Sequence, residues 1–339
     1  MLLNGADPRA IDDAADRLAA GQLLAFPTET VYGLGARADD TAAVARIFAA
    51  KGRPLDHPLI VHVSDATAAQ HFAASWPPLA ARLAAAFWPG PLTLIVARRP
   101  GVASAAASGQ NTIGLRCPGH PLAHALLVAA AARGVPGVAA PSANRFGRIS
   151  PTTAAHVQAE FGEHLSVLDG GACSDGIESA IVDCSRGRPV LLRPGSLTRE
   201  ALAAAAGEPL ADRDAEAPRA SGTLEAHYAP RARLRLMPSA ALGEALAVWA
   251  DAQAAAVAKS SFAPAAPRLA VYSRTLRAPK AAGLVARVMP GVARAAAFEL
   301  FAVLRELDAQ GVALIWVEQP PPGADWDGVR DRLQRAAAS

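Results

Sequence analysis

Hydrophobic residues in the first two hundred or so positions form short strand-length runs that alternate with amphipathic stretches of helical period. This alternation is typical of an α/β domain. The clearest unit spans residues 23–63, where two apolar runs, 23–26 and 59–63, bracket a hydroxyl-rich turn, a helix and a basic loop. Pro and Gly bound both runs, so we predict strand, loop, helix, loop and strand in this order.

The same pattern continues toward residue 206. We predict further strands at residues 92–97, 112–116, 138–140, 167–169, 177–182 and 190–192. We predict helices over 8–20, from about 66, over 78–87, over 120–133, after 150 and over 198–206. These elements form a mixed α/β domain over residues 1–206.

The character of the chain changes at residue 207. Residues 207–230 are rich in charge, Pro and Gly and have almost no apolar period, which is typical of a linker. From residue 231 to 339 strand and helix patterns alternate again, and βα alternation favours a small parallel sheet with crossover helices. We therefore predict a second, smaller α/β domain after the linker.

Composition and charge narrow the class of protein. The chain has 339 residues, 52% hydrophobic and 19% charged, with a formal net charge of +3. This charge is too small to indicate wholesale nucleic-acid binding. Three cysteines show no C-x-x-C spacing, and an odd number argues against a disulfide framework. No signal peptide or membrane-length apolar run is seen, so we expect a cytoplasmic protein.

A basic loop offers the first candidate chemistry. Lys51 and Arg53 are separated by one glycine, and Arg and Lys are the side chains that bind phosphate oxygens. Read alone, such a pair is more often two solvated charges at a helix end. Here they belong to one unit with the polar turn 28–32, so a pocket and a plain surface are about equally favoured.

Other polar residues at strand ends leave alternatives open. Thr112 and Arg116 alternate to one face of a strand, and an inward Arg needs either a structural carboxylate or a bound anion. Ser142 and Asn144 follow a strand end, where a plain turn is the simpler interpretation. The histidine pair of the 57–62 segment has no third metal ligand beside it.

Several common sites are excluded by spacing. Residues 33–38 match G-x-G-x-x-A, but the preceding strand is predicted to end at residue 26, too early for a dinucleotide fingerprint. The chain lacks a P-loop motif, a G-x-S-x-G elbow and a zinc motif. Hydroxyls and arginines at strand ends without a nucleophile suit a reaction in which two substrates are positioned and phosphate charge is neutralised.

Six motifs in order then give a specific resemblance. They are FPTETVYGLG at 26–35, KGRP at 51–54 with HPLIVHV at 57–63, TIGLRCP at 112–118, PSAN at 141–144 with SPT at 150–152, ESAIVD at 178–183 and LLRPG at 191–195. This series resembles the YrdC-type threonylcarbamoyl-AMP synthase family. The segment SGTLEAHYAP at 221–230 and the domain after it resemble the long form of that family.

The resemblance implies a fold and a reaction. It implies a YrdC-like twisted mixed sheet with flanking helices and a smaller Rossmann-like C-terminal α/β domain. It implies that L-threonine, bicarbonate or CO2 and ATP, with Mg2+, form threonylcarbamoyl-AMP and pyrophosphate. The product would pass to the tRNA threonylcarbamoyl-transferase machinery, and direct tRNA binding is left open.

The resemblance also implies site residues, matched position by position. The L-threonine positions are Thr30, His62, Arg116, Ser179 and, through its backbone, Ala140. The ATP positions are Lys51, Arg53, His57, Thr112, Ser142, Asn144, Ser150, Arg193, His227 and Tyr228, with Lys51 and Arg53 as the catalytic cations and the last two closing over the nucleotide from the linker.

Some positions depart from the family pattern, and two alternatives remain. The family commonly has Asn at position 57 and Ser at position 146, where this chain has His57 and Phe146, and Ala180 replaces a usual Thr. A double-stranded-RNA-binding module of YrdC-like fold is the alternative function. A carbamoyl-transferring domain shares the fold but would need zinc-finger regions that the sequence lacks.

Overall fold

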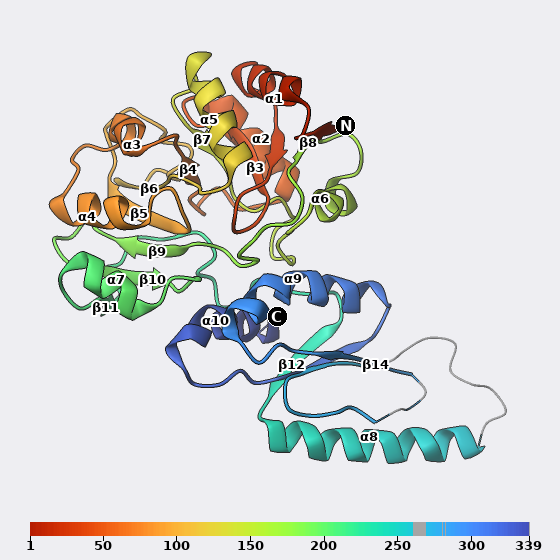
Figure 1. Cartoon of the computed structure of the whole chain (residues 1–339). Coiled ribbons are helices and arrows are strands. Elements are labelled where there is room, and N and C mark those ends of the chain that lie inside the picture. Colours follow the sequence, from red (N-terminus) through yellow and green to blue (C-terminus); the bar gives the residue numbers. More distant parts are fainter. Residues whose placement is uncertain (260–268, 280, 282, 339) are drawn as a thin grey trace. The chain divides into compact units, whose positions relative to one another are not determined.

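The computed structural model describes residues 1–259, 269–279, 281 and 283–338. The chain divides into two compact units (Figure 1). Unit 1 comprises Met1–Phe146 and Ser150–Thr223, and unit 2 comprises Gly147–Ile149 and Leu224–Ser339. A short piece of the N-terminal sequence thus belongs to unit 2. The predicted boundaries at 206/207 and 230/231 stay a prediction.

Unit 1 is built on one mixed eleven-stranded sheet of order β1-β8-β2-β3-β7-β4-β6-β5-β9-β10-β11. The strands are β1 (Leu2–Asn4), β2 (Leu24–Phe26), β3 (Gly33–Arg37), β4 (Ile60–His62), β5 (Leu92–Ala97), β6 (Thr112–Arg116), β7 (Val138–Ala139), β8 (Ser166–Asp169), β9 (Ala180–Asp183), β10 (Val190–Arg193) and β11 (Ala211–Asp212). Pairings of both directions occur, which confirms the predicted mixed sheet.

Helices flank this sheet in Figure 1. They are α1 (Pro8–Ala19), α2 (Thr41–Lys51), α3 (Ala66–Phe72), α4 (Pro78–Phe87), α5 (Pro121–Ala132), α6 (Ala154–Phe161) and α7 (Arg199–Ala206). One apolar cluster joins α1 and α5 to strands β2, β7 and β8, and a larger cluster holds buried residues of α2, α3, α4 and α7. The predicted helices are therefore confirmed, and their apolar faces form the core.

Local interactions of the capping residues start and end α2. Asp40 accepts hydrogen bonds from the backbone N–H groups of Ala42 and Ala43, which caps the helix start. Gly52 ends it with a positive φ of 62°, a conformation that glycine adopts without a steric penalty. Lys51 is the last residue of α2, and Arg53 follows directly after Gly52.

One prediction in this region was wrong. Residues 33–37 are not part of a loop, because they form β3, which pairs antiparallel with β2. Two glycines suggested a turn, but a Cβ on Gly35 would lie 2.8 Å from the rings and methyls of Phe26 and Val138. Glycine therefore permits close packing inside a strand here. The rejection of a dinucleotide fingerprint holds, since the motif lies in a strand and not at a strand-to-helix turn. Strand β1 was also missed.

The predicted linker is partly built into unit 1. Ala211 and Asp212 form β11, which pairs with β10. Ala217 and Ala220 pack against an apolar cluster of Ile60, Ile95, Ile181, Val190 and Leu192 on the sheet. Alanines spaced in a charged, proline-rich segment give no periodic signal, which is why composition alone indicated a linker.

Unit 2 contains a four-stranded parallel sheet of order β12-β15-β13-β14, as predicted for the C-terminal domain. Its elements are β12 (Arg233–Met237), α8 (Ser239–Lys259), β13 (Leu269–Ser273), β14 (Leu284–Val288), α9 (Ala293–Ala309), β15 (Leu314–Glu318), a 3₁₀ turn (Ala324–Trp326) and α10 (Asp327–Ala337). Across the described residues of both units, no helix has the length and apolar character needed to cross a membrane.

Candidate functional site

Polar side chains gather at one edge of the unit 1 sheet. Strands β4, β6, β5, β9 and β10 are neighbours in this order. His62 and Arg116 end two parallel strands, Thr93 and Ser179 lie at the start of the next two, and Arg193 ends the last. Because β5 runs antiparallel to β6, and β10 to β9, these positions fall at the same edge. The topology therefore unites residues more than a hundred positions apart.

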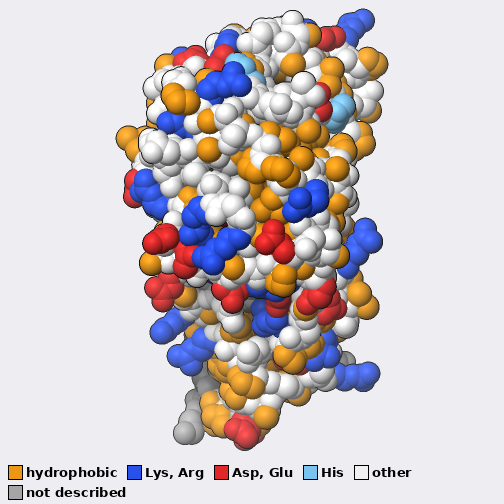
Figure 2. All heavy atoms as spheres, turned by 90° about the vertical axis from the view of Figure 1, so that its left-hand side faces the viewer, with side chains coloured by type: hydrophobic (Ala, Val, Ile, Leu, Met, Phe, Trp, Pro, Cys, Tyr) orange, Lys and Arg blue, Asp and Glu red, His pale blue; other side chains and the backbone are white. Residues whose placement is uncertain are grey.

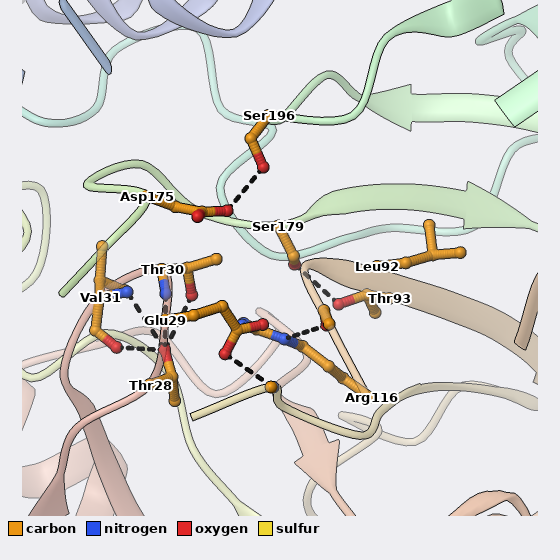
Figure 3. A network of polar contacts seen from close by, with 12 residues as sticks. Thr28, Glu29, Thr30, Val31, Leu92, Thr93, Arg116, Asp175, Ser179 and Ser196 are labelled. Atoms are coloured by element: carbon orange, nitrogen blue, oxygen red, sulfur yellow. Dashed lines mark hydrogen bonds and ion pairs between the residues drawn. The ribbon is translucent and has the colours of Figure 1, made fainter. Parts of the chain in front are cut away.

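Arg116 is paired with a carboxylate inside this edge. Its Nη2 lies 2.7 Å from Oε1 of Glu29, and its Nε donates to the Gly90 carbonyl (Figure 3). The other oxygen of Glu29 accepts from the backbone N–H of Gly119 at 2.9 Å. Both side chains are buried, with 5% and 11% of their surfaces exposed. The structure thus answers one open alternative: the inward arginine has a structural carboxylate.

A hydroxyl turn leads into Glu29. Thr28 Oγ1 lies 2.8 Å from Thr30 Oγ1 and donates to the Val31 carbonyl at 2.6 Å (Figure 3). The same oxygen accepts from the backbone N–H groups of Thr30 and Val31. Hydroxyl-to-backbone bonds of this kind fix the path of a turn. Thr30 is fully buried, so its hydroxyl is held inside unit 1.

Arg193, the last residue of β10, is hydrogen-bonded to Ser179 just before the start of the neighbouring β9. Its Nε and Nη2 donate to the Ser179 carbonyl at 3.1 and 2.9 Å, and Nη2 also reaches Ser179 Oγ at 3.2 Å. Ser179 Oγ lies 2.8 Å from Thr93 Oγ1 (Figure 3). Thr93 and Ser179 are both fully buried. The hydroxyls of Thr93 and Ser179 and the guanidinium of Arg193 therefore hold one another in position across three neighbouring strands.

The linker residue Ser221 joins two of the predicted cations. Arg193 Nη1 donates to its carbonyl at 2.9 Å, and Arg53 Nη2 lies 3.3 Å from its Oγ. Arg53 also donates to the carbonyls of His57 and Pro58. The loop cation and the strand cation, 140 positions apart in the sequence, thus meet at one residue of the predicted linker.

A small cavity lies beside Ser221. It measures about 20 Å³ and is lined by Pro58, Leu59, Ile60, Thr93, Ile95, Gln110, Thr112, Gly114, Ile181, Arg219, Ala220 and Ser221. Thr93 lies near the start of β5 and Thr112 at the start of the antiparallel β6, so the lining comes from both ends of this strand pair. Gln110 holds the segment above it through reciprocal hydrogen bonds with the backbone of Arg219, at 3.2 and 3.0 Å. The volume is enough for about one water molecule.

Lys51 binds backbone carbonyls of the loop that follows β7. Its Nζ donates to the Ser142 carbonyl at 2.6 Å and to the carbonyl of Asn144. The residue is only 3% exposed, and burial, reinforced by nearby Arg53, holds the pKa of its ammonium well below the ordinary value. Lys51 therefore fixes the backbone of Ser142 and Asn144 in this structure. Ala140, just upstream, donates its N–H to the Ile60 carbonyl.

Two of the three residues that depart from the family pattern, His57 and Phe146, contact each other. The rings of His57 and Phe146 lie 5.4 Å apart in an edge-to-face arrangement. The guanidinium of Arg53 lies 5.7 Å from the centre of the Phe146 ring, within the range of a cation–π interaction. Burial and then Arg53 lower the pKa of His57, which favours its neutral form. His57 and Phe146 thus pack together beside Arg53, the side chain predicted to bind phosphate.

His62 is a buried neutral histidine. It is 3% exposed, packs edge-on against Phe26 at 5.9 Å and pairs in register with Arg116. Burial, followed by the charge of Arg116, lowers its pKa to about 3. Its Nδ1 is buried without a hydrogen-bond partner among the described residues. A neutral ring atom in this position is available to a ligand, which fits the predicted substrate role.

The remaining predicted residues lie in two places. Ser150 donates its hydroxyl to Glu178 within unit 1, just before the Ser179 position. His227 and Tyr228 are buried in unit 2, with 6% and 1% of their surfaces exposed. The Tyr228 ring packs 5.4 Å from Phe301.

The residues that sequence reasoning missed are Glu29 as the partner of Arg116, Thr93 and Ser221. A single threonine inside the apolar run 92–97 was the available signal for Thr93.

The charged side chains of unit 1 and unit 2 are mixed in sign on the surface that Figure 2 shows. On the face shown in Figure 2, Lys and Arg are interspersed with Asp and Glu and form no continuous basic surface. Within the described ranges, no group of three or more His, Cys, Asp or Glu side chains is placed to hold a metal ion. Cys117, Cys173 and Cys184 are buried free thiols, and burial raises the pKa of each.

Comparison with known proteins decides the family. A family model described as "Telomere recombination" matches residues 16–195, and one described as "Threonylcarbamoyl-AMP synthase, C-terminal domain" matches residues 197–338. The chain belongs to the threonylcarbamoyl-AMP synthase family. The threonylcarbamoyl-AMP synthase of Bacillus subtilis is 44% identical over 237 residues, covering 68% of this chain and 67% of that protein. That of Schizosaccharomyces pombe is 32% identical over 353 residues, covering 93% and 85%.

A solved structure extends the agreement to both units. The crystal structure of Pyrococcus abyssi Sua5 complexed with L-threonine matches with a TM-score of 0.85 at 32% identity, covering 99% of this chain and 97% of that one. The predicted fold class and the resemblance to the long form of the threonylcarbamoyl-AMP synthase family are therefore confirmed. These matches support the enzyme interpretation and give no support to an RNA-binding module.

Proposed function

We propose that this chain is an L-threonylcarbamoyladenylate synthase, a nucleotidyltransferase that joins L-threonine, bicarbonate or CO2 and ATP. The products are threonylcarbamoyl-AMP and pyrophosphate. The observation that carries the proposal is the convergence of Arg53 and Arg193 at Ser221, beside the edge that holds Arg116 and His62. Two anion-binding groups next to a buried polar edge suit a nucleotide and an amino acid bound side by side.

The threonine end is proposed to lie at the Arg116 edge. The Arg116 guanidinium has five N–H donors, and its bonds to Glu29 and Gly90 engage two of its nitrogens, so the threonine carboxylate can approach the guanidinium as a further anion. Thr30, Ser179 and neutral His62 supply hydrogen-bonding groups. The Ala140 backbone lies beside β4, since its N–H donates to the Ile60 carbonyl. L-threonine appears in the P. abyssi Sua5 complex, which supports this substrate.

The nucleotide end is proposed to lie toward Arg53 and Arg193. Lys51, through the backbone of Ser142 and Asn144, orders the loop, while Arg53 and Arg193 neutralise phosphate charge. Thr112, Ser150 and His57 are proposed to contact the nucleotide, together with His227 and Tyr228 of the linker segment. Mg2+ would be held by phosphate oxygens and water, because Mg2+ usually keeps several waters and binds substrate phosphates.

The reaction follows from these positions. The threonine amine adds to CO2 to give a carbamate, whose oxygen attacks the α-phosphorus as the bond to pyrophosphate breaks. Cationic side chains offset the charge that develops on the leaving pyrophosphate. Carbamates decompose in water, so the packing of residues 217–221 over the sheet face fits a need to exclude solvent. The product is expected to be used by the tRNA threonylcarbamoyl-transferase machinery in the cytoplasm.

A direct assay tests the proposal. Purified protein with L-threonine, bicarbonate, ATP and Mg2+ should release pyrophosphate, and release should require threonine. Serial omission of each substrate provides the controls. Release of inorganic phosphate instead, or pyrophosphate release independent of threonine, would refute the proposed function.

A further inference from the structure

A three-residue segment of the N-terminal sequence is part of unit 2. Gly147–Ile149 group with Leu224–Ser339, whereas the chain on both sides of the segment belongs to unit 1. Asn144 and Ser150, on either side of it, are both proposed nucleotide ligands. Whatever fixes Gly147–Ile149 therefore constrains, through a few covalent bonds, the positions of two site residues.

Backbone contacts hold this segment against the linker. Ala229 donates its N–H to the Gly147 carbonyl at 2.8 Å, and Arg148 and Ala229 form a parallel bridge. Arg305 of α9 donates to the carbonyl of Ile149. The segment after Asn144 and the segment after Tyr228 are thus paired like two short strands.

One carboxylate binds both segments. Oδ1 of Asp308 accepts from the backbone N–H groups of Arg231 at 2.7 Å and Ala232 at 2.9 Å. Oδ2 accepts from Arg231 Nε at 3.2 Å and from Arg148 Nη2 at 3.4 Å. The Asp308 side chain is only 6% exposed. A buried carboxylate with charged and backbone donors on both oxygens makes strong, directional contacts.

Helix stability does not account for Asp308. It lies in the last turn of α9 (Ala293–Ala309), where the helix dipole places partial negative charge and disfavours an acid. Burial adds a further cost for the charged form. The carboxylate satisfies donors of both segments, and its structural effect is to set one relative to the other.

The segment that Asp308 holds begins at a strained residue. Tyr228 has a φ of +64°, which is uncommon for a bulky side chain. Its ring packs between Phe301 and the guanidinium of Arg332, at 5.4 and 5.6 Å. Backbone strain of this type persists where surrounding contacts enforce it, and often at functional positions. Asp308 binds the backbone N–H groups of Arg231 and Ala232, three and four residues after Tyr228, and so anchors the chain that leaves this conformation.

We propose that Asp308 is a positioning residue for the nucleotide. By binding Arg148 on one side and the backbone of residues 231–232 on the other, it fixes the register of the two segments that carry Asn144, Ser150, His227 and Tyr228. The inference rests on the proposed function and adds a residue that touches no substrate. Its effect should fall on ATP and not on threonine, since the proposed threonine residues all belong to unit 1 and none lies in the two segments that Asp308 binds.

The test compares Asp308→Asn with Glu306→Gln. Asparagine keeps one oxygen acceptor but removes the charge and the second acceptor. Glu306 lies two residues away on α9, pairs with Arg287 and is half-exposed, so it is a matched control. We expect Asp308→Asn to raise KM for ATP about tenfold, the effect of losing about 1.4 kcal/mol of positioning. The threonine dissociation constant should change less than twofold, and Glu306→Gln should behave as wild type.

A double-mutant cycle with Arg148→Ala separates positioning from general destabilisation. If Asp308 acts through Arg148, the double variant should show an ATP KM close to that of the worse single variant. A folded Asp308→Asn protein with unchanged ATP KM, or with ATP and threonine weakened equally, would overturn the proposal. If Asp308→Asn does not fold, a wild-type ATP KM in Arg148→Ala overturns it instead. Failure of wild type to release pyrophosphate would refute the proposed function and not this inference.

Discussion

Arg193 and Ser221 are joined by a hydrogen bond of 2.9 Å from the guanidinium Nη1 to the backbone carbonyl. Ser221 belongs to the segment that sequence composition marks as a linker, and Arg193 ends a central strand of the site. Arg53 reaches the hydroxyl of the same serine. A residue of the linker therefore contacts the two arginines proposed to bind phosphates. We expect a bound triphosphate to compete with Ser221 for these donors.

Replacing Arg193 with Lys should impair the reaction without unfolding the protein. The guanidinium makes separate bonds to Ser179 and Ser221 from different nitrogens, and a lysine ammonium cannot reproduce this planar geometry. We expect kcat/KM for ATP to fall by about 10- to 100-fold, measured by pyrophosphate release. The control is Arg188→Lys, an exposed arginine just before β10 that pairs with Asp214. Equal losses in both variants would contradict the assignment.

Removal of the Gln110 side chain should loosen the linker segment. Its amide makes reciprocal hydrogen bonds to the Arg219 backbone. Their loss leaves residue 219 without its backbone anchor, between the packed alanines 217 and 220 and the bonds of the two arginines to Ser221. We expect Gln110→Ala to increase the rate of tryptic cleavage after Arg219 severalfold, followed by mass spectrometry of fragments. Gln70→Ala, at an exposed position of α3, should leave the rate unchanged. Unchanged cleavage in Gln110→Ala would show that other contacts hold the segment.

Substitution of Lys51 should reduce both stability and activity. Lys51→Met keeps the length of the side chain but leaves the carbonyls of Ser142 and Asn144 without their ammonium donor. An unsatisfied buried acceptor costs about 1–3 kcal/mol, so we expect the free energy of unfolding in urea to fall by about 2–4 kcal/mol. Pyrophosphate release should fall with it, because the loop that carries Asn144 loses its fixed position. A variant with wild-type stability and no activity would instead favour direct contact with phosphate.

Protonation of His62 should destabilise the protein in acid. The ring titrates near 6.5 when unfolded and at about 3 when folded, because burial opposes its charge. Between these values the unfolded chain binds more protons, so stability falls as pH falls below 6.5. His62→Gln should lose about 1 kcal/mol less than wild type when urea unfolding at pH 5.5 is compared with pH 6.5, because the unfolded ring is already half protonated at pH 6.5. His164→Gln, at an exposed position, should match wild type. Equal acid sensitivity of all three proteins would contradict the buried neutral state.

The elements of the fold could be predicted where local signals are strong. Periodic apolar positions, caps such as Asp40 and helix ends such as Gly52 act within a few residues, so they are visible in the sequence. Strand β3 was missed because Gly33 and Gly35 carry the composition of a turn, and only packing against Phe26 shows that a strand needs them. Site residues could be named from motif order, but no local rule shows which of them face each other.

Sequence by itself determined the α/β class, most of the helices and strands and the family, because these depend on short-range periodicity and ordered motifs. Tertiary structure decided that Glu29 is the anion beside Arg116, that Ser221 joins Arg53 to Arg193, and that Asp308 binds two segments 80 positions apart or more. The physical reason is that hydrogen bonds and ion pairs act over about 3 Å in space, whatever the separation along the chain. Only the sheet order brings such partners within that distance.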